Sequence, residues 1–379
     1  MNRFYPPSGL RESNPTKAQG LLAGLHLDLP LLTGLILLCL YGLFVLYSAS
    51  DQNSAHIERQ LIRLALAFTV MVVVAQIPPA QLRRWSPRLY AISLLLLVAV
   101  LIVGHVGKGA QRWLDLGFFR FQPAELAKLA VPMMITCYLA EKTLPPTWQR
   151  LAIAGIMILV PVLMIAKQPD LGTSLLVTSA GIFVLFLAGL SWRFMGGMIV
   201  TTIPAGWVLW EWGMREYQRS RVLTFLDPER DPLGSGYHII QSKIAIGSGG
   251  LYGKGWLNGT QSHLEFLPER TTDFIFAVLS EEFGLTGVVL LLSLYLFIIL
   301  RGLYIATQAQ DTFNRLLGGA LTLVFFVYLF VNTGMVSGLL PVVGVPLPLV
   351  SYGGTSLVTI MAGFGILMSI HTHRKLLPT

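Results

Sequence analysis

The stretch FLPERTTDFIFAVLSEEFG, residues 266–284, reads as the entry to a membrane helix that carries acidic residues at its mouth and within its length. The apolar run after Asp273 predicts a span, because about 20 largely apolar residues cross a bilayer. Arg270 and Asp273 stand at the mouth of this span, and Glu281 and Glu282 fall inside it. Ionisable side chains at membrane depth are costly, so these residues call for a functional role or for partners.

The composition of the whole chain is that of an integral membrane protein. Its 379 residues are 54% hydrophobic and 12% charged, and a soluble domain this apolar would expose large apolar patches. The net charge of +8 does not indicate a nucleic-acid partner, because the basic residues are scattered between apolar segments. Cys39 and Cys137 both fall in predicted spans, which argues against a disulfide framework or a thiolate metal site.

The apolar runs predict an all-α, polytopic membrane protein with ten transmembrane helices. The predicted spans are residues 30–50, 57–77, 88–106, 122–141, 149–167, 171–190, 194–212, 273–301, 314–338 and 349–371. The chain then divides into a polar N-terminal tail (1–29), a membrane domain (30–371) and a C-terminal tail (372–379). The N-terminal tail lacks the charged-then-apolar pattern of a cleavable leader, so we expect the first helix to be retained.

The basic residues predict the orientation of the chain in the membrane. With the N-terminus inside, the inner segments hold 13 of the 27 Lys and Arg residues and the short outer segments hold 6. Because cytoplasmic loops carry the excess of Lys and Arg, both termini are predicted to be cytoplasmic. Residues 213–272 then form one long periplasmic loop, in which residues 239–246 have helical spacing. Ordered loops of this length are usually functional.

Asp273 is the first candidate for chemistry. One interpretation is a helix cap, since TTDF suits an N-terminus and acids are favoured there. The other is a general base at the membrane surface. Glu281 and Glu282 point about 80° and 180° away from Asp273 on a helix, so the three acids cannot all line one pocket. We expect structural roles for Glu281 and Glu282.

A second candidate is FQPAELAKLAVP (121–132), which places Glu125 and Lys128 on one helix face. They form either a structural ion pair or a cationic, acid-supported wall for a polar substrate, and we favour the wall. The segment SGLLPVVGVPLPLVSYGGTS (337–356) has too many Pro and Gly residues for a plain turn. Non-helical backbone at that depth must line a cavity or be covered by protein, and its N–H groups can hold an anion or a sugar.

The glycine-rich stretch GSGGLYGKG (247–255) is not a nucleotide phosphate loop. Ser248 stands where the first Gly belongs, and Gly255 follows Lys254 in place of Ser or Thr.

Several of these stretches together resemble the SEDS family of shape, elongation, division and sporulation proteins. They are QPAELAKLA, QPDLGTS, DPLGSGYHIIQSKIAIGSGG, GKGW, FLPERTTDFIFAVLSEEFG and PVVGVPLPLVSYGGTS, and the resemblance runs from about residue 27 to 375. It implies a ten-helix glycosyltransferase of the bacterial inner membrane that polymerises lipid II into peptidoglycan during cell elongation. It also implies that Asp273 is essential and that Glu125 and Lys128 are the family's membrane-embedded acid and base. Thr355 stands where a Ser is common.

The implied reaction assigns roles to these residues. The acceptor's 4-OH attacks C1 of the donor sugar and polyprenyl pyrophosphate leaves, with Asp273 as general base, an effect of about 10²–10⁴-fold. Positive charge must stabilise the leaving group. We assign substrate and pyrophosphate binding to Arg221, Lys243, Arg270, Ser351 and Tyr352. A divalent cation, Mg or Mn, is a further expectation, with ligands unknown and no organic cofactor.

The resemblance implies partners as well: lipid II as substrate, a class B penicillin-binding protein as transpeptidase, and other membrane proteins of the elongation complex. Two alternatives stay open, a lipid II flippase and a non-catalytic scaffold. The position of Asp273 at the outer mouth, away from the midplane, favours an enzyme over a transporter. A scaffold has no need of Asp273.

Overall fold

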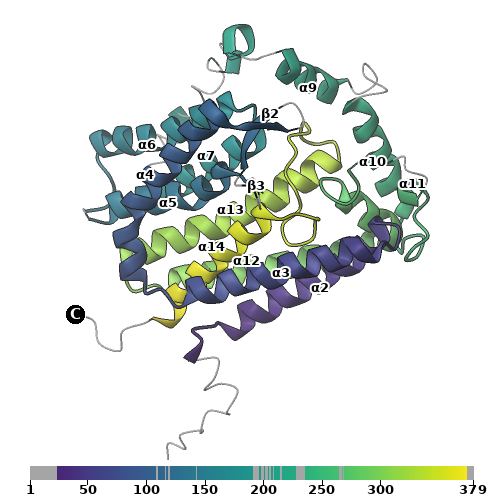
Figure 1. The fold of residues 1–379 in the computed structure, drawn as a ribbon, viewed down its shortest axis with the longest axis horizontal. Helices are drawn as coiled ribbons and strands as arrows, with labels where there is room; N and C mark the ends of the chain where they lie inside the picture. Colours follow the sequence, from purple (N-terminus) through teal and green to yellow (C-terminus); the bar gives the residue numbers. More distant parts are fainter. Residues whose placement is uncertain are drawn as a thin grey trace, which may run out of the picture.

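Long helices make up most of the computed structural model (Figure 1). The structure describes residues 24–107, 110–115, 117, 120–141, 143–190, 209–213, 216–227, 235–263, 267 and 269–373, with isolated positions between 196 and 207. Within these ranges, six helices are long and apolar enough to cross a membrane. The chain is therefore a mostly helical membrane protein.

The long helices follow the apolar runs of the sequence. They are α2 (Leu29–Ala49), α3 (Ser54–Ala75), α4 (Pro79–Val103), α5 (Pro123–Ala140), α6 (Trp148–Lys167), α7 (Leu171–Leu187), α12 (Ile275–Thr307), α13 (Thr312–Val336) and α14 (Thr355–Thr372). Each matches one predicted span. The predicted span 194–212 lies mostly outside the described residues, apart from a π-helical turn at Leu209–Gly213. The count of ten spans therefore stays a prediction.

Three predicted helix boundaries were wrong. α4 begins at Pro79 and not at residue 88, because Pro is accommodated in a first helical turn and Arg is a good helix former outside the membrane. α14 begins at Thr355 and not at residue 349. α12 continues to Thr307, and its backbone leaves helical geometry at Gly284, where φ is 61°. Hydropathy marks the apolar part of a helix and not its ends.

The helices α12, α13 and α14 run through the middle of the bundle. α2 packs on α12 and α3 packs on α14, while α5 and α7 pack on α13 from the other side (Figure 1). The rings of His26 and His373 stack with centroids 4.0 Å apart. Both ends of the described chain therefore lie at the same end of the bundle, and the orientation of that end in the membrane stays a prediction.

A small sheet joins α4 to α5 and is an addition to the all-α fold that the sequence predicted. Its strands are β1 (His105–Gly107), β2 (Ala110–Asp115) and β3 (Arg120–Phe121), paired antiparallel in the order β1-β2-β3. The connecting segment is too short and too rich in Gly for another helix. Local strand pairing satisfies its backbone N–H and C=O groups instead.

The predicted long loop contains helices α9 (Glu216–Leu226), α10 (Ser235–Gly249) and α11 (Thr260–His263). The helix predicted from the spacing of residues 239–246 is confirmed as part of α10. α10 packs on the bundle: Ser242 Oγ donates to the carbonyl of Val336 at 2.8 Å, and the His238 ring stacks on Phe274 at 5.6 Å. The loop therefore covers the start of α12.

Candidate functional site

Residues 337–354 connect α13 to α14 without a helix and pack on the start of α12. The Tyr352 N–H donates to the carbonyl of Thr271 at 2.8 Å. Asn332 Nδ2, from α13, donates to the carbonyls of Asp273 at 2.9 Å and of Val345 at 2.8 Å. These contacts fix the backbone of Asp273 against the non-helical segment, whose polar groups are thereby covered by protein.

The Asp273 carboxylate lies next to Gly344, a residue that lines a cavity. Its Oδ2 lies 3.5 Å from the position that a Cβ on Gly344 would occupy, and Gly344 lines a cavity of about 210 Å³. Gly344 has φ 74°, a conformation that favours glycine. Asp273 is half-buried, and the glycine at position 344 stands between its carboxylate and the cavity.

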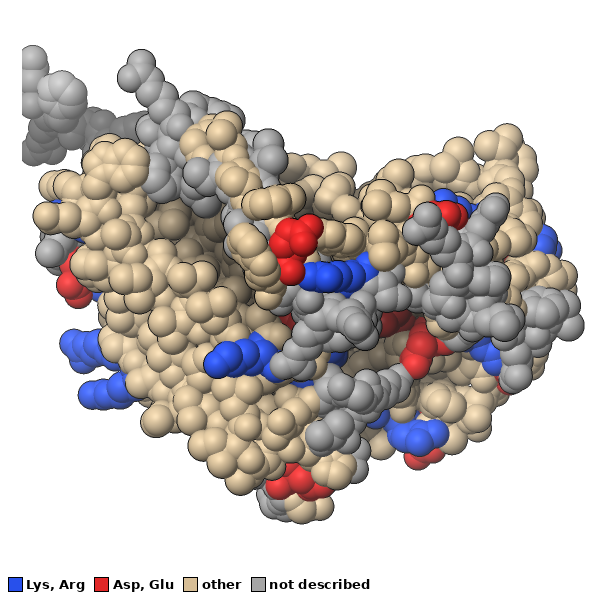
Figure 2. All heavy atoms as spheres, turned by 90° about the horizontal axis from the view of Figure 1, so that it is seen from above, with Lys and Arg blue, Asp and Glu red and all other residues tan. Residues whose placement is uncertain are grey.

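Polar and charged side chains line this cavity. They are Arg112, Gln122, Glu125, Lys128, Asp170 and Tyr328, from β2, α5, the start of α7 and α13. Figure 2, which views the molecule from above, shows acidic and basic side chains around a hollow. A cavity with this lining suits a strongly polar, charged ligand.

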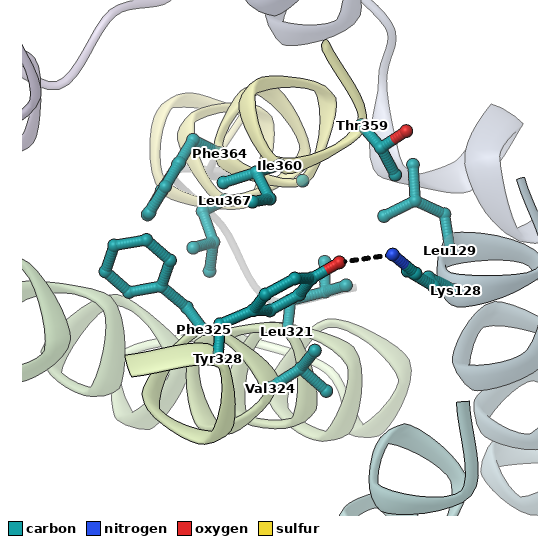
Figure 3. A pocket seen from close by; sticks show the side chains of 11 residues that line it. Lys128, Leu129, Leu321, Val324, Phe325, Tyr328, Thr359, Ile360, Phe364 and Leu367 are labelled. Carbon is teal, nitrogen blue, oxygen red and sulfur yellow. Dashed lines mark hydrogen bonds between the residues drawn. The ribbon is translucent and has the colours of Figure 1, made fainter. Parts of the chain in front are cut away.

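Glu125, Lys128 and Tyr328 form one buried cluster on the cavity wall. Lys128 Nζ donates to Glu125 Oε1 at 2.7 Å. It also donates to Tyr328 Oη at 2.6 Å (Figure 3). Pro123 stands at the start of α5, which places Glu125 in the first turn, where a carboxylate is favoured. Glu125 Oε2 is buried and has no hydrogen-bond partner among the described residues. Glu125 and Lys128 form an ion pair, and both side chains line the cavity.

A second cluster, centred on Asp170, was missed by sequence reasoning. Asp170 caps α7 by accepting from the Thr173 N–H at 3.3 Å, and it also accepts from Gln122 Nε2 at 2.8 Å. An Arg112 guanidinium nitrogen lies 3.8 Å from Asp170 Oδ1. The motif QPDLG, with an acid between two spans, was an available signal for Asp170. Tyr328 had none, because it stands in an uninterrupted apolar run.

The far side of the contact between Lys128 and Tyr328 is apolar. A narrow groove of about 40 Å³ begins at these two side chains and runs between α5, α13 and α14 (Figure 3). Its walls include Leu321, Phe325 and Phe364. Lys128 and Tyr328 line both the charged cavity and the apolar groove, so the two meet at these residues.

Among the other predicted binding residues, Lys243, Arg270, Ser351 and Tyr352 do not line the cavity. Ser351 is buried, and its Oγ accepts from the Leu347 N–H at 2.8 Å. Tyr352 packs under the guanidinium of Arg63, 4.3 Å from the ring centroid. Arg270 forms an ion pair with Asp51. Further predicted residues are the exposed Lys243, which lies beside Gly338, and Arg221, which falls in α9 with its side chain outside the described residues.

The glycine-rich stretch docks on α12 through its backbone. The Lys254 and Gly255 N–H groups donate to the carbonyls of Glu281 at 3.0 Å and Glu282 at 2.9 Å. The kink of α12 at Gly284 lies at this contact, because a Cβ there would lie 2.4 Å from the backbone nitrogen of Gly253. These glycines thus permit close backbone approach.

Within the described part of the chain, no three His, Cys, Asp or Glu side chains form a metal site. A divalent ion here would therefore need substrate oxygens among its ligands, as is usual for Mg²⁺ bound with pyrophosphate. Glu125 and Asp170 are the carboxylates that line the cavity in the described part of the chain.

Sequence comparison relates this arrangement to known proteins. Residues 29–376 match the FtsW/RodA/SpoVE family model, described as "Cell cycle protein". The chain is 58% identical over 352 residues to "Peptidoglycan glycosyltransferase MrdB" of Escherichia coli (strain K12), with 93% of this chain and 95% of that protein covered. It is 30% identical over 423 residues to "Peptidoglycan glycosyltransferase RodA" of Treponema pallidum (strain Nichols), with coverage of 92% and 98%.

Two solved structures have folds similar to that of this chain. One chain, from a study titled "Structural coordination of polymerization and crosslinking by a peptidoglycan synthase complex", superposes with a TM-score of 0.80 at 33% identity. The alignment covers 92% of this chain and 99% of that chain. The crystal structure of Thermus thermophilus rod shape determining protein RodA has a TM-score of 0.70 at 28% identity, with coverage of 92% and 98%.

Proposed function

The chain belongs to the FtsW/RodA/SpoVE family, and we propose that this peptidoglycan glycosyltransferase polymerises lipid II with Asp273 as its general base. The family resemblance that the motifs indicated is confirmed. One observation carries the proposed mechanism: the Asp273 carboxylate lies next to Gly344, on the wall of the cavity that Arg112 and Lys128 also line.

The chemistry requires a base and a stabiliser of negative charge. The acceptor's sugar hydroxyl attacks C1 of the donor while Asp273 takes its proton, because an alkoxide does not form unaided near neutral pH. The bond from C1 to the pyrophosphate oxygen breaks, and polyprenyl pyrophosphate leaves. Asp273 is suited to this step because it stands next to a residue of the cavity wall, on backbone held by Asn332.

Lys128 and Arg112 are the cations on the cavity wall, and we assign them to the leaving pyrophosphate. Each is held by an acid, Glu125 or Asp170, so the cations keep their place when the cavity is empty. We propose that three further cations guide the substrate toward the cavity, namely Arg221, Lys243 and Arg270. We propose that Ser351 and Tyr352 help to hold the substrate. A bound magnesium or manganese ion would add positive charge at the pyrophosphate.

The apolar groove supports a lipid-linked substrate. It adjoins the charged cavity at Lys128 and Tyr328, and its apolar walls suit a hydrocarbon chain, although its volume of about 40 Å³ holds only a small part of one. A free nucleotide sugar would have no use for such a groove.

We further propose ten spans in the bacterial inner membrane, with both tails, 1–29 and 372–379, cytoplasmic and the loop 213–272 periplasmic. The structure of the peptidoglycan synthase complex supports a class B penicillin-binding protein as partner. Other membrane proteins of the elongation complex stay a proposal that rests on the family resemblance alone.

The decisive experiment is polymerisation of lipid II by the purified protein in detergent. Asp273→Asn keeps the side-chain shape and removes the base, so glycan strands should be lost while the protein elutes as wild type. Glu269→Gln is the matched control, since it removes a nearby exposed acid and should retain activity. Normal strand synthesis by Asp273→Asn would remove this residue from the mechanism.

A further inference from the structure

A second, larger cavity lies at the opposite end of the bundle from the candidate site. It has a volume of about 1040 Å³ and is enclosed by the starts of α4 and α13 and by the ends of α5 and α14. Its polar lining includes Arg83, Arg84, Glu141, Asp311, Asn314 and His373. Nothing in the proposed glycosyl transfer uses this cavity.

One wall of the cavity carries two cations. Arg83 lies 3.8 Å from Glu141, but both side chains are well exposed, at 42% and 60%, so solvent screens this pair. Arg84 is exposed and forms no ion pair with any residue that the structure describes. Two adjacent guanidinium groups of this kind are suited to bind a phosphate.

The other wall presents hydrogen-bond acceptors. Asp311 accepts from the Asn314 N–H at 2.7 Å and from Asn314 Nδ2 at 2.8 Å. Asn314 is buried, with 8% of its surface exposed, and its Oδ1 has no hydrogen-bond partner among the described residues. Asp311 and Asn314 both line the cavity, so this wall carries a carboxylate and a carboxamide.

The cavity lies near an exposed apolar face of α4. The exposed apolar face of α4 includes Ile92 and Leu95, and Arg83 precedes Ile92 by about 13 Å along the helix. Pro87, Cys137 and Phe313 add apolar surface to the lining. A molecule here would have its polar part on the two walls and its apolar part beside the bilayer.

We propose that this cavity binds the head group of phosphatidylethanolamine. Its phosphate would lie on Arg83 and Arg84, and its ammonium would donate to the carboxylates of Glu141 and Asp311, which also line the cavity. Two cations facing two carboxylates complement a zwitterion better than a purely anionic head group, which would meet the carboxylates unpaired. The site is independent of the proposed lipid II reaction.

Lipid titration of the full chain, followed by native mass spectrometry, tests this assignment. The probes are phosphatidylethanolamine, phosphatidylcholine and phosphatidylglycerol with identical acyl chains. Phosphatidylethanolamine should bind about tenfold more tightly than phosphatidylcholine, which has the same phosphate but no N–H donor. Arg83→Gln with Arg84→Gln should lower the affinity for phosphatidylethanolamine by about tenfold or more.

Arg88→Gln is the matched control, because Arg88 is exposed on α4 but does not line the cavity. It should bind as wild type. If the double variant does not fold, Arg84→Gln alone replaces it in the test, because Arg84 is exposed and its substitution should not disturb folding. Equal affinity for all three lipids, tighter binding of phosphatidylglycerol, or unchanged binding by a well-folded arginine variant would each overturn the proposal.

Discussion

Lys254 Nζ lies 2.7 Å from Glu281 Oε1, which joins the glycine-rich part of the long loop to a fully buried acid in α12. The same oxygen accepts from Thr260 Oγ1 and from the Gln261 N–H, both at 3.0 Å. The acid within the span thus holds the loop against the bundle, eight residues after the proposed base.

Removing either partner of this pair should destabilise the protein. Glu281→Gln removes the negative charge that pairs with Lys254. Lys254→Met leaves the buried carboxylate of Glu281 without its cation. Each variant should lower the free energy of unfolding by about 3 kcal/mol. The double variant should lose less than the sum of the two, because the charges disappear together. Thermal unfolding in detergent measures the three variants, and strict additivity would show that the two charges do not interact.

Gly253 should tolerate no side chain. A Cβ there would lie 2.1 Å from the carbonyl oxygen of Glu282, on a backbone with φ 77°, so Gly253→Ala must displace the loop. Gly250 is the matched control, with φ 57° and nothing within 4 Å of its Cβ position. We expect a clearly larger drop in melting temperature for Gly253→Ala, and equal drops would mean that backbone strain alone matters.

The order of charges at Glu125 and Lys128 should matter for activity. The exchange Glu125→Lys with Lys128→Glu keeps a buried pair but removes the cation beside Tyr328. Folding should recover relative to either single variant, while polymerisation of lipid II should not. Full polymerisation by the exchanged pair would show that the pair is only structural and that Lys128 does not bind pyrophosphate.

Tyr328→Phe isolates the hydroxyl that accepts from Lys128. The substitution keeps the ring that lines the apolar groove, so the fold should be unaffected. Loss of a hydrogen bond to a charged group should lower kcat/KM for lipid II by about tenfold. Tyr295→Phe is a control at a buried tyrosine that does not line the cavity, and an equal loss in both variants would indicate general damage.

Stability should fall in acid because of Asp28. Burial raises the pKa of this carboxyl, but hydrogen bonds from Arg301 and the Leu31 N–H outweigh burial, so the pKa lies below the usual 3.8. The folded protein therefore holds this proton less tightly than the unfolded chain. The resulting stability is present above about pH 4 and is lost as pH falls through the lower, folded pKa.

Asp28→Asn should accordingly lower the melting temperature at pH 7 and flatten its decline between about pH 5 and 3. The measurement is thermal unfolding across pH in one detergent. A decline as steep as that of the wild type would assign the acid sensitivity to other carboxyls.

The sequence by itself determined the features that depend on neighbouring residues. Apolar runs located nine described helices, because burial of a span in hydrocarbon needs only local hydrophobicity. Spacing alone paired Glu125 with Lys128, since residues three apart share a helix face. The motif around Asp273 marked the acid at the mouth of α12 for the same reason, as a local departure from an apolar pattern.

Only the tertiary structure decided what surrounds these residues. Tyr328 reaches Lys128 across 200 positions of sequence, and Gln122 reaches Asp170 across 48, through packing of helices that no local pattern specifies. The kink at Gly284 exists because the backbone near Gly253 lies against it. A cavity is the space that several elements leave between them, so its position and its charge follow from how those elements pack and not from any one stretch of the chain.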